Sequence, residues 1–307
     1  MMVFLMLGLM QVTILGQKIN VLQTVIIVDI KPQKFTAPQF SPDGKRILFS
    51  EFGYRGLWIY DLAKKQTFCL NDLPGAGYAP VFSSNGELIY FETDTYVNSK
   101  RYSSLATQSI ADKQIQYLIK EERYLFPVRL LADETVVYRQ NNEIKYVSRL
   151  QKAAPLSKPL TEVIGYSEGT TIILFINGIR KELTPFGHRH YIWFSLSPDQ
   201  NRMLFTVAGG GTFICDLEAK VLVQLGKAHA PRWSPDGQWI VYMVDEDDGH
   251  TYTASDLWVV SSDGLQKLQL TSTINEIEMF PAWSPALDKI VFETMSGKIA
   301  YLNIEIK

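Results

Sequence analysis

The sequence is poor in the features that mark several large classes of protein. Its 307 residues contain two cysteines, Cys69 and Cys215, and neither has a second cysteine at the spacing of a metal site. The two also fall in repeats that should be distant, so a disulfide is not expected. With 30 Lys and Arg against 32 Asp and Glu, the net charge is -2 and no basic stripe appears. This balance excludes the clustered positive charge that nucleic-acid binding needs.

Sustained helical periodicity is also missing, whereas apolar content is normal. Hydrophobic residues make up 46% of the chain, which is enough for a large core. The apolar residues occur in short runs separated by turn-forming residues, and such runs are typical of strands. We therefore predict an all-β protein, and nothing in the sequence predicts a cofactor.

The first sixteen residues form the longest apolar stretch, interrupted only by Gln11 and Thr13. This stretch is short for a membrane span and is typical of the hydrophobic part of a secretory signal. We predict a signal peptide over residues 1–16, cleaved near Gly16 and Gln17, and a mature chain 17–307 without a transmembrane span. No Lys or Arg precedes the run, so a buried first strand or an uncleaved anchor are the alternatives. Export would place the protein in a bacterial periplasm or outside the cell.

One motif recurs along the chain. Residues 37–49, APQFSPDGKRILF, match residues 230–242, APRWSPDGQWIVY, position by position. Further copies occur at residues 79–91, 197–205 and 280–292, and a degenerate copy at 126–138. Repeats of this kind indicate an array of similar structural units.

Each copy predicts two strands joined by a tight turn. Within Ser-Pro-Asp-Gly, Pro presets its φ angle, Asp bonds the local backbone and Gly adopts a positive φ. The strand that follows is continuously hydrophobic instead of alternating with polar residues, so both of its faces should be buried. Sheets stacked face to face around an axis provide this burial, which predicts a single β-propeller.

The spacing of the turns predicts seven blades. Turns begin near residues 41, 83, 131, 197, 234 and 284, and the interval from 131 to 197 is too long for one blade of about 40–45 residues. That interval contains strand-like residues 171–176 and an Asn177-Gly178 hairpin turn, which we interpret as a reduced blade. Six blades with an insertion is the alternative.

The ring also needs to be closed. The last repeat has room for only three strands, and residues 20–30 form a strand without a blade of its own. We expect this N-terminal strand to join the last blade, because an open ring would leave an unpaired edge.

The motif resembles the PD-repeat of TolB-like propellers, which are relatives of the WD40-like repeat family. The resemblance covers residues 36–307, with intact copies at Ser41–Gly44 and Ser234–Gly237. Relatives include periplasmic TolB, which engages partner proteins at the cell envelope, and the propellers that cover the catalytic domain of prolyl-oligopeptidase-like peptidases. They also include oligogalacturonate lyases, in which the propeller itself is catalytic. The resemblance implies the fold and leaves the function open.

A Gly-x-Ser-x-Gly sequence at Gly165–Gly169 could suggest a serine nucleophile. That motif needs a helix after the serine to present it on a sharp turn. Here the following residues, 170–175, are a β-branched run that predicts a strand. We interpret the segment as a turn between strands and predict no catalytic residue.

Metal binding has only weak candidates, Asp245, Asp247 and His229. Residues 245–250, DEDDGH, are dense enough in carboxylates to bind Ca²⁺, but their order does not match an EF-hand loop. A lyase-like metal site would require histidines such as His188, His190 and His229 to converge. Solvated acidic residues and ordinary loop histidines are the simpler interpretation.

The predicted binding surface is the channel mouth on the face opposite the Ser-Pro-Asp-Gly turns. Loops 93–102 and 245–255 are expected to be the longest on this face. The candidate binding residues are Thr36, Tyr78, Glu92, Tyr96, His190, His229, Tyr252, Met279 and Glu293. We expect a non-catalytic, exported propeller that binds a protein or glycan partner. A metal-dependent polysaccharide lyase or hydrolase and an accessory propeller of a peptidase are the alternatives.

Metal analysis separates the first two possibilities. The purified protein should contain no stoichiometric Mn, Ca or Zn, and EDTA should leave its thermal unfolding midpoint unchanged. One bound metal ion per chain, measured by elemental analysis, would favour the lyase.

Overall fold

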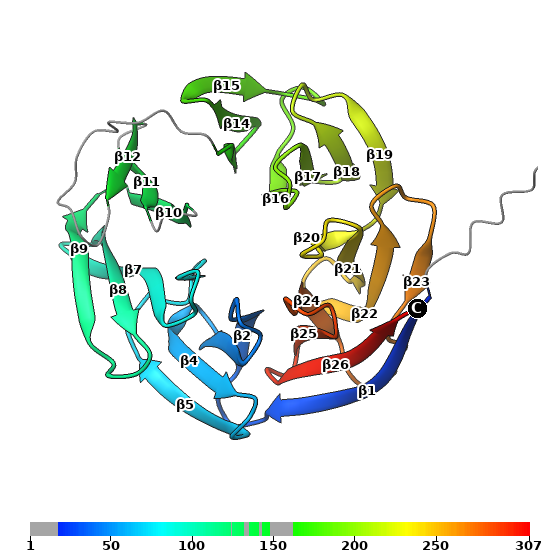
Figure 1. Cartoon of the computed structure of the whole chain (residues 1–307), viewed down its shortest axis with the longest axis horizontal. Helices are drawn as coiled ribbons and strands as arrows, with labels where there is room; N and C mark the ends of the chain where they lie inside the picture. The colour runs from blue at the N-terminus through cyan, green and yellow to red at the C-terminus, as the bar shows by residue number, and fades with distance from the viewer. Residues whose placement is uncertain (1–17, 124, 132–134, 141–142, 148–161) are drawn as a thin grey trace, which may run out of the picture.

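The computed structural model describes residues 18–123, 125–131, 135–140, 143–147 and 162–307. The predicted signal peptide, residues 1–16, lies outside this range. The described residues contain strands and no helix, so within them there is no apolar helix of membrane-spanning length. Their strands form seven sheets arranged as a ring around a central opening (Figure 1). The prediction of an all-β propeller is confirmed.

Four sheets each contain four strands that are consecutive in the chain. The first contains β2 (Phe35–Phe40), β3 (Arg46–Glu51), β4 (Arg55–Asp61) and β5 (Gln66–Asn71). The second contains β6 (Val81–Phe82), β7 (Leu88–Val97), β8 (Lys100–Ser109) and β9 (Ile115–Glu122). A third sheet contains β16 (Tyr191–Leu196), β17 (Arg202–Val207), β18 (Gly211–Asp216) and β19 (Val221–Gly226). A fourth contains β20 (His229–Trp233), β21 (Trp239–Asp247), β22 (Tyr252–Ser261) and β23 (Lys267–Gln269).

Two sheets have three strands among the described residues. One contains β10 (Leu125–Leu130), β11 (Val136–Gln140) and β12 (Glu143–Val147). The other contains β13 (Ile164–Glu168), β14 (Thr171–Ile176) and β15 (Ile179–Leu183), so the segment interpreted from sequence as a reduced unit forms a sheet of its own.

The remaining sheet combines both ends of the described chain. It has the order β1-β26-β25-β24, formed by β1 (Ile19–Val28), β24 (Glu278–Trp283), β25 (Lys289–Thr294) and β26 (Ile299–Ile306). Strands β1 and β26 pair antiparallel, from Ile19 opposite Ile306 to Val28 opposite Ile299. The backbone amides of Lys18 and Lys307 donate to each other's carbonyl oxygens at 2.8 Å.

The core consists of layers between neighbouring sheets. In β3, Ile47, Leu48 and Phe49 are at most 1% exposed. Leu48 packs with side chains of the second sheet, whereas Ile47 and Phe49 pack with those of the β1-β26-β25-β24 sheet. Successive side chains on a strand point to opposite faces, so a continuous hydrophobic run fills two layers at once. This is the double burial expected from the sequence.

A buried serine organises the turn after the innermost strand. Ser234 is fully buried; its hydroxyl donates to Asp236 Oδ1 at 2.5 Å and accepts from the Trp239 amide at 2.9 Å. The same arrangement of hydroxyl, side-chain acceptor and backbone amide occurs at Ser41, Ser83, Ser197 and Ser284. Gly44 and Gly237 both have φ of 68°, as the turn chemistry predicts. The serine therefore fixes the chain reversal from inside the protein.

The two long loops expected on the opposite face are largely strand. Residues 93–97 continue β7 and residues 100–102 begin β8, and β21 and β22 extend similarly to Asp247 and from Tyr252. In each hairpin the two strands continue to pair with each other, so the antiparallel ladder extends beyond the hydrophobic run of the strand. The predicted loops are thus projecting hairpins with short turns.

Replacing the buried serine should cost stability. Ser234→Ala leaves the buried Trp239 amide without its side-chain acceptor and should lower the free energy of unfolding by about 1–3 kcal/mol. Urea denaturation measures this change. Ser262→Ala, in the β22–β23 turn, is the control and should change stability by less than about 0.5 kcal/mol. Equal effects of the two substitutions would contradict the role given to Ser234.

Candidate functional site

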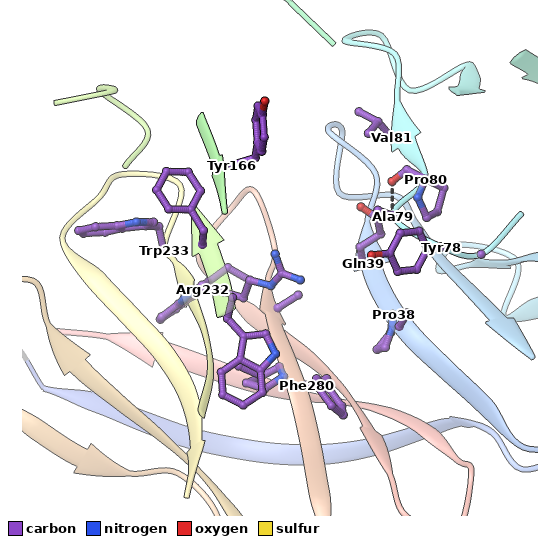
Figure 2. A pocket seen from close by; sticks show the side chains of 18 of the residues that line it. Pro38, Gln39, Tyr78, Ala79, Pro80, Val81, Tyr166, Arg232, Trp233 and Phe280 are labelled. Atoms are coloured by element: carbon purple, nitrogen blue, oxygen red, sulfur yellow. Dashed lines mark hydrogen bonds between the residues drawn. The ribbon is translucent and has the colours of Figure 1, made fainter. Parts of the chain in front are cut away.

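A central cavity of about 1110 Å³ lies between the innermost strands (Figure 2). Its lining extends from Thr36, Tyr78 and Glu293 near one mouth to Pro198 and Pro235 in the turns at the other end. Residues of the inner strands β2, β6, β13, β16, β20 and β24 contribute to the wall. The cavity is therefore the channel that the ring encloses.

An irregularity recurs where the innermost strands pass the cavity. The ladder shifts register between Thr36 and Gln39 in β2, and equivalent shifts occur in β10, β16, β20 and β24. One residue of each equivalent segment in five sheets has φ between 45° and 55°: Ala37, Ala79, Trp193, Ala230 and Phe280. Bulges of this kind redirect side chains, and here those five residues line the cavity.

Trp193 and Phe280 are unusual occupants of this position. A bulky side chain at positive φ is strained by about 1–3 kcal/mol, whereas the equivalent sites in three other sheets hold the small Ala. Their sheets are those on either side of the β20 sheet. The two strained residues, Trp193 and Phe280, therefore both lie in the channel wall.

Arg232, on β20, also lines the cavity. Its side chain is exposed to solvent inside the channel, although protein surrounds it closely enough that desolvation lowers the pKa of its guanidinium. Among the described residues, this guanidinium has no hydrogen bond, ion pair or ring contact. An arginine remains charged at neutral pH even so.

Two tyrosines lie at the mouth. Tyr54 and Tyr78 meet edge to face with ring centroids 5.3 Å apart, and they are 41% and 51% exposed. Burial of part of the ring and the nearby Glu293 raise the pKa of Tyr54. The pair presents apolar rings and polar hydroxyls at the opening, a combination suited to contact surfaces.

Glu293 connects the β25 sheet with the neighbouring β2 sheet. Its Oε2 accepts the Thr36 hydroxyl at 2.8 Å and the Ala37 amide at 2.6 Å. Burial raises the pKa of Glu293 to about 7, while the two hydrogen bonds act in the opposite direction. The carboxylate is thus already engaged at the channel mouth.

Glu92 occupies the equivalent position on β7 but does not line the cavity. It is 9% exposed, and its Oε1 atom has no hydrogen-bond partner. Burial, followed by repulsion from Asp94, raises the pKa of Glu92 to about 7. Glu92 is therefore a buried acid with few favourable interactions to offset its desolvation.

His229 forms an internal pair with Asp245. Its Nδ1 lies 2.5 Å from Asp245 Oδ1, and its ring packs against Trp193 at a centroid distance of 5.3 Å. Asp245 is 1% exposed on β21, so the prediction that it belongs to a solvated loop is wrong. The pair fixes the orientation of the imidazole at the start of β20.

The remaining metal candidates do not converge. Asp247 Oδ1 accepts the Gly249 amide at 2.9 Å within the hairpin turn, and His188 and His190 are exposed before β16. No group of three or more metal-ligating side chains occurs in the part of the chain that the structure describes.

The predicted binding residues therefore divide into two sets. Thr36, Tyr78 and Glu293 line the channel, whereas His229, Glu92, Met279, Tyr96, Tyr252 and His190 do not. Met279 is buried in the core, and Tyr96 is 67% exposed near the tip of the β7–β8 hairpin. Sequence reasoning missed Arg232, Trp193, Phe280 and Tyr166. For Arg232, Trp193 and Phe280, the available signal was a charged or aromatic residue at positions of the repeat that hold Gln39 or Ala37 in the first copy.

The Gly-x-Ser-x-Gly segment forms the end of β13 and the turn into β14. No helix follows Ser167, as expected. A Cβ atom on Gly165 would lie 2.8 Å from Phe194 and Leu174 atoms, so this glycine allows close packing of neighbouring sheets.

The ring of sheets around a central channel defines this protein as a β-propeller. It is similar to oligogalacturonate lyase from Vibrio parahaemolyticus, with a TM-score of 0.65 and 12% identity over 94% of this chain and 96% of that one. It is also similar to TolB from Acinetobacter baumannii, with a TM-score of 0.54 and 19% identity over 84% of this chain. The chain spans 59% of the length of that TolB.

These similarities confirm a TolB-like propeller fold. Because the sequence identities are low, they are no evidence of a shared function. No protein-family model and no curated protein sequence matches the chain.

Glu92 predicts a pH-dependent stability. The pKa of Glu92 in the folded protein is about 7, above its ordinary value of 4.5. The contribution of Glu92 to the free energy of unfolding is therefore complete below about pH 4.5, and it is lost as the pH rises through 7 because the buried carboxyl then becomes charged. Glu92→Gln keeps the shape without the charge and should stabilise the protein at pH 8 by up to about 3 kcal/mol. Denaturant unfolding at pH 5 and pH 8 measures the difference.

Glu246→Gln, at an exposed position of β21, is the matched control and should change stability equally little at both pH values. A Glu92→Gln protein no more stable than the wild type at pH 8 would contradict the assignment.

Proposed function

We propose that this protein is a non-catalytic binding propeller that engages a protein or glycan partner at the mouth of its channel. The observation that carries the proposal is the exposed Tyr54–Tyr78 pair beside the opening of the 1110 Å³ cavity. Amphipathic aromatic side chains with few rotatable bonds are enriched at the centre of binding surfaces. A concave mouth next to them is a common place for ligands on closed β structures.

The β7–β8 hairpin supports the same face. Tyr96 and Val97, near its tip, are 67% and 55% exposed, and the strands extend past the hydrophobic run that builds the core. An isolated apolar side chain on a surface means little, but two adjacent ones on a projecting hairpin suit a contact with a partner.

We further infer that each of the seven sheets is one blade and that β1 closes the ring. The separate β13–β15 sheet supports seven blades over six with an insertion, and the β1–β26 ladder supports closure. Export through a signal peptide at residues 1–16 to the periplasm or the exterior remains part of this proposal.

A lyase is the second candidate because of one local arrangement. The buried Asp245 holds Nδ1 of His229, which leaves Nε2 free to accept a proton if the Nδ1–H tautomer is present. The likeness to oligogalacturonate lyase agrees with this candidate at the level of the fold.

Mouth substitutions test the binding proposal. Tyr54→Ser combined with Tyr78→Ser should reduce capture of the specific partner, protein or glycan, at least tenfold, because truncating central aromatic residues removes most of the binding energy. Pull-down from envelope extracts and a glycan array measure the loss. Tyr117→Ser, an exposed tyrosine on β9, is the control.

Equal capture by the mouth variant and the control, with unchanged thermal midpoints, would reject the proposal. Release of unsaturated sugar ends from oligogalacturonate, lost in His229→Asn, would favour the lyase instead.

A further inference from the structure

Arg232 is a cation in the channel that has no hydrogen-bond or ion-pair partner among the described residues. Arg232 is on the innermost strand of its sheet, and its side chain is directed toward the open centre of the channel (Figure 2). Enclosed charges in proteins are normally paired, because desolvation otherwise costs stability. The described residues supply no counter-charge to this guanidinium.

Carboxylates also line the described part of the channel wall, but none of them forms an ion pair with Arg232. Glu293 is occupied by Thr36 and Ala37, and Glu168 also lines the cavity without an ion pair to the arginine. At the position equivalent to Arg232, the β2, β16 and β24 sheets carry the uncharged Gln39, Ser195 and Ala282, whereas the β10 sheet carries Arg129. A charge at this position is therefore not required by the repeat.

Two strained aromatic residues lie on the sheets flanking the arginine. Trp193 on β16 and Phe280 on β24 have φ of 52° and 50°, and both line the cavity. Strands β16 and β24 each contact β20. Strained backbone that places large rings beside an unpaired charge in a cavity is typical of a binding site.

We propose that the channel binds a small organic monocarboxylate with a flat apolar body. The guanidinium of Arg232 would take the carboxylate through paired hydrogen bonds, and the rings of Trp193 and Phe280 would contact the apolar part. The cavity volume is ample for a small ligand, whereas the rigid surface of a folded partner could not reach inside the ring. This inference does not rest on the partner binding proposed for the mouth.

Calorimetric titration with 2-naphthoate tests the site in the full-length protein. The wild type should bind 2-naphthoate at least tenfold more tightly than neutral 2-naphthamide, and at least tenfold more tightly than acetate. Arg232→Gln should weaken naphthoate binding about tenfold to a hundredfold, because a charge-assisted pair is lost. Arg180→Gln is the control, since that arginine is exposed on β15 and does not line the cavity.

Thermal unfolding of the unliganded variants separates binding from a structural role. The Arg232→Gln protein should have an unchanged or higher midpoint, because an unpaired enclosed charge is removed. A large drop in the midpoint would mean that Arg232 supports the fold, and would overturn the inference.

The aromatic part is tested separately with Phe280→Leu, which should weaken naphthoate binding but not acetate binding. Naphthoate binding that survives Arg232→Gln, absence of naphthoate binding, or equal binding of inorganic phosphate would each reject the proposed ligand class. Binding confined to an acidic peptide and lost in Arg232→Gln would move the site to a different class of ligand.

Discussion

The structure depends on the face-to-face burial of the second strand of each sheet. Ile47, Leu48 and Phe49 are almost completely buried because two neighbouring sheets cover opposite faces of β3. No single sheet can provide this, so each sheet needs a neighbour on both sides. A ring is the arrangement in which every sheet has two neighbours, and the shared sheet of β1 and β26 brings the ends of the described chain together.

The channel is a consequence of that arrangement, and its chemistry depends on small departures from the repeat. In five of the sheets, one residue of the inner segment has a positive φ and lies in the channel wall, where the small side chain of Ala causes the least strain. Trp193 and Phe280 break the pattern on either side of Arg232, so the described part of the channel wall departs from the repeat on both sides of the β20 sheet. Repetition builds the scaffold, and local exceptions to the repeat give the channel wall its distinct side chains.

Buried polar side chains serve three distinct purposes in this ring. Ser234 and its equivalents satisfy backbone groups at the turns, and Glu293 joins two sheets at the channel mouth. Asp245 orients His229. Glu92 fits none of these purposes: its Oε1 has no partner and its pKa is raised by burial, so it is a cost to the folded state at neutral pH. The first three purposes follow from the hydrogen bonds that these side chains make.

The sequence by itself determined the fold class, because the Ser-Pro-Asp-Gly turn and the doubly hydrophobic strand after it are local signals that repeat in register. It also placed Thr36, Tyr78 and Glu293 near the channel mouth, since equivalent positions of a repeat occupy equivalent places in the ring. Only the tertiary structure decided that Asp245 is buried against His229, that Met279 belongs to the core, and that Arg232 has no partner among the described residues. Those facts depend on side chains from different sheets, and the distances between sheets are set by packing and not by sequence spacing.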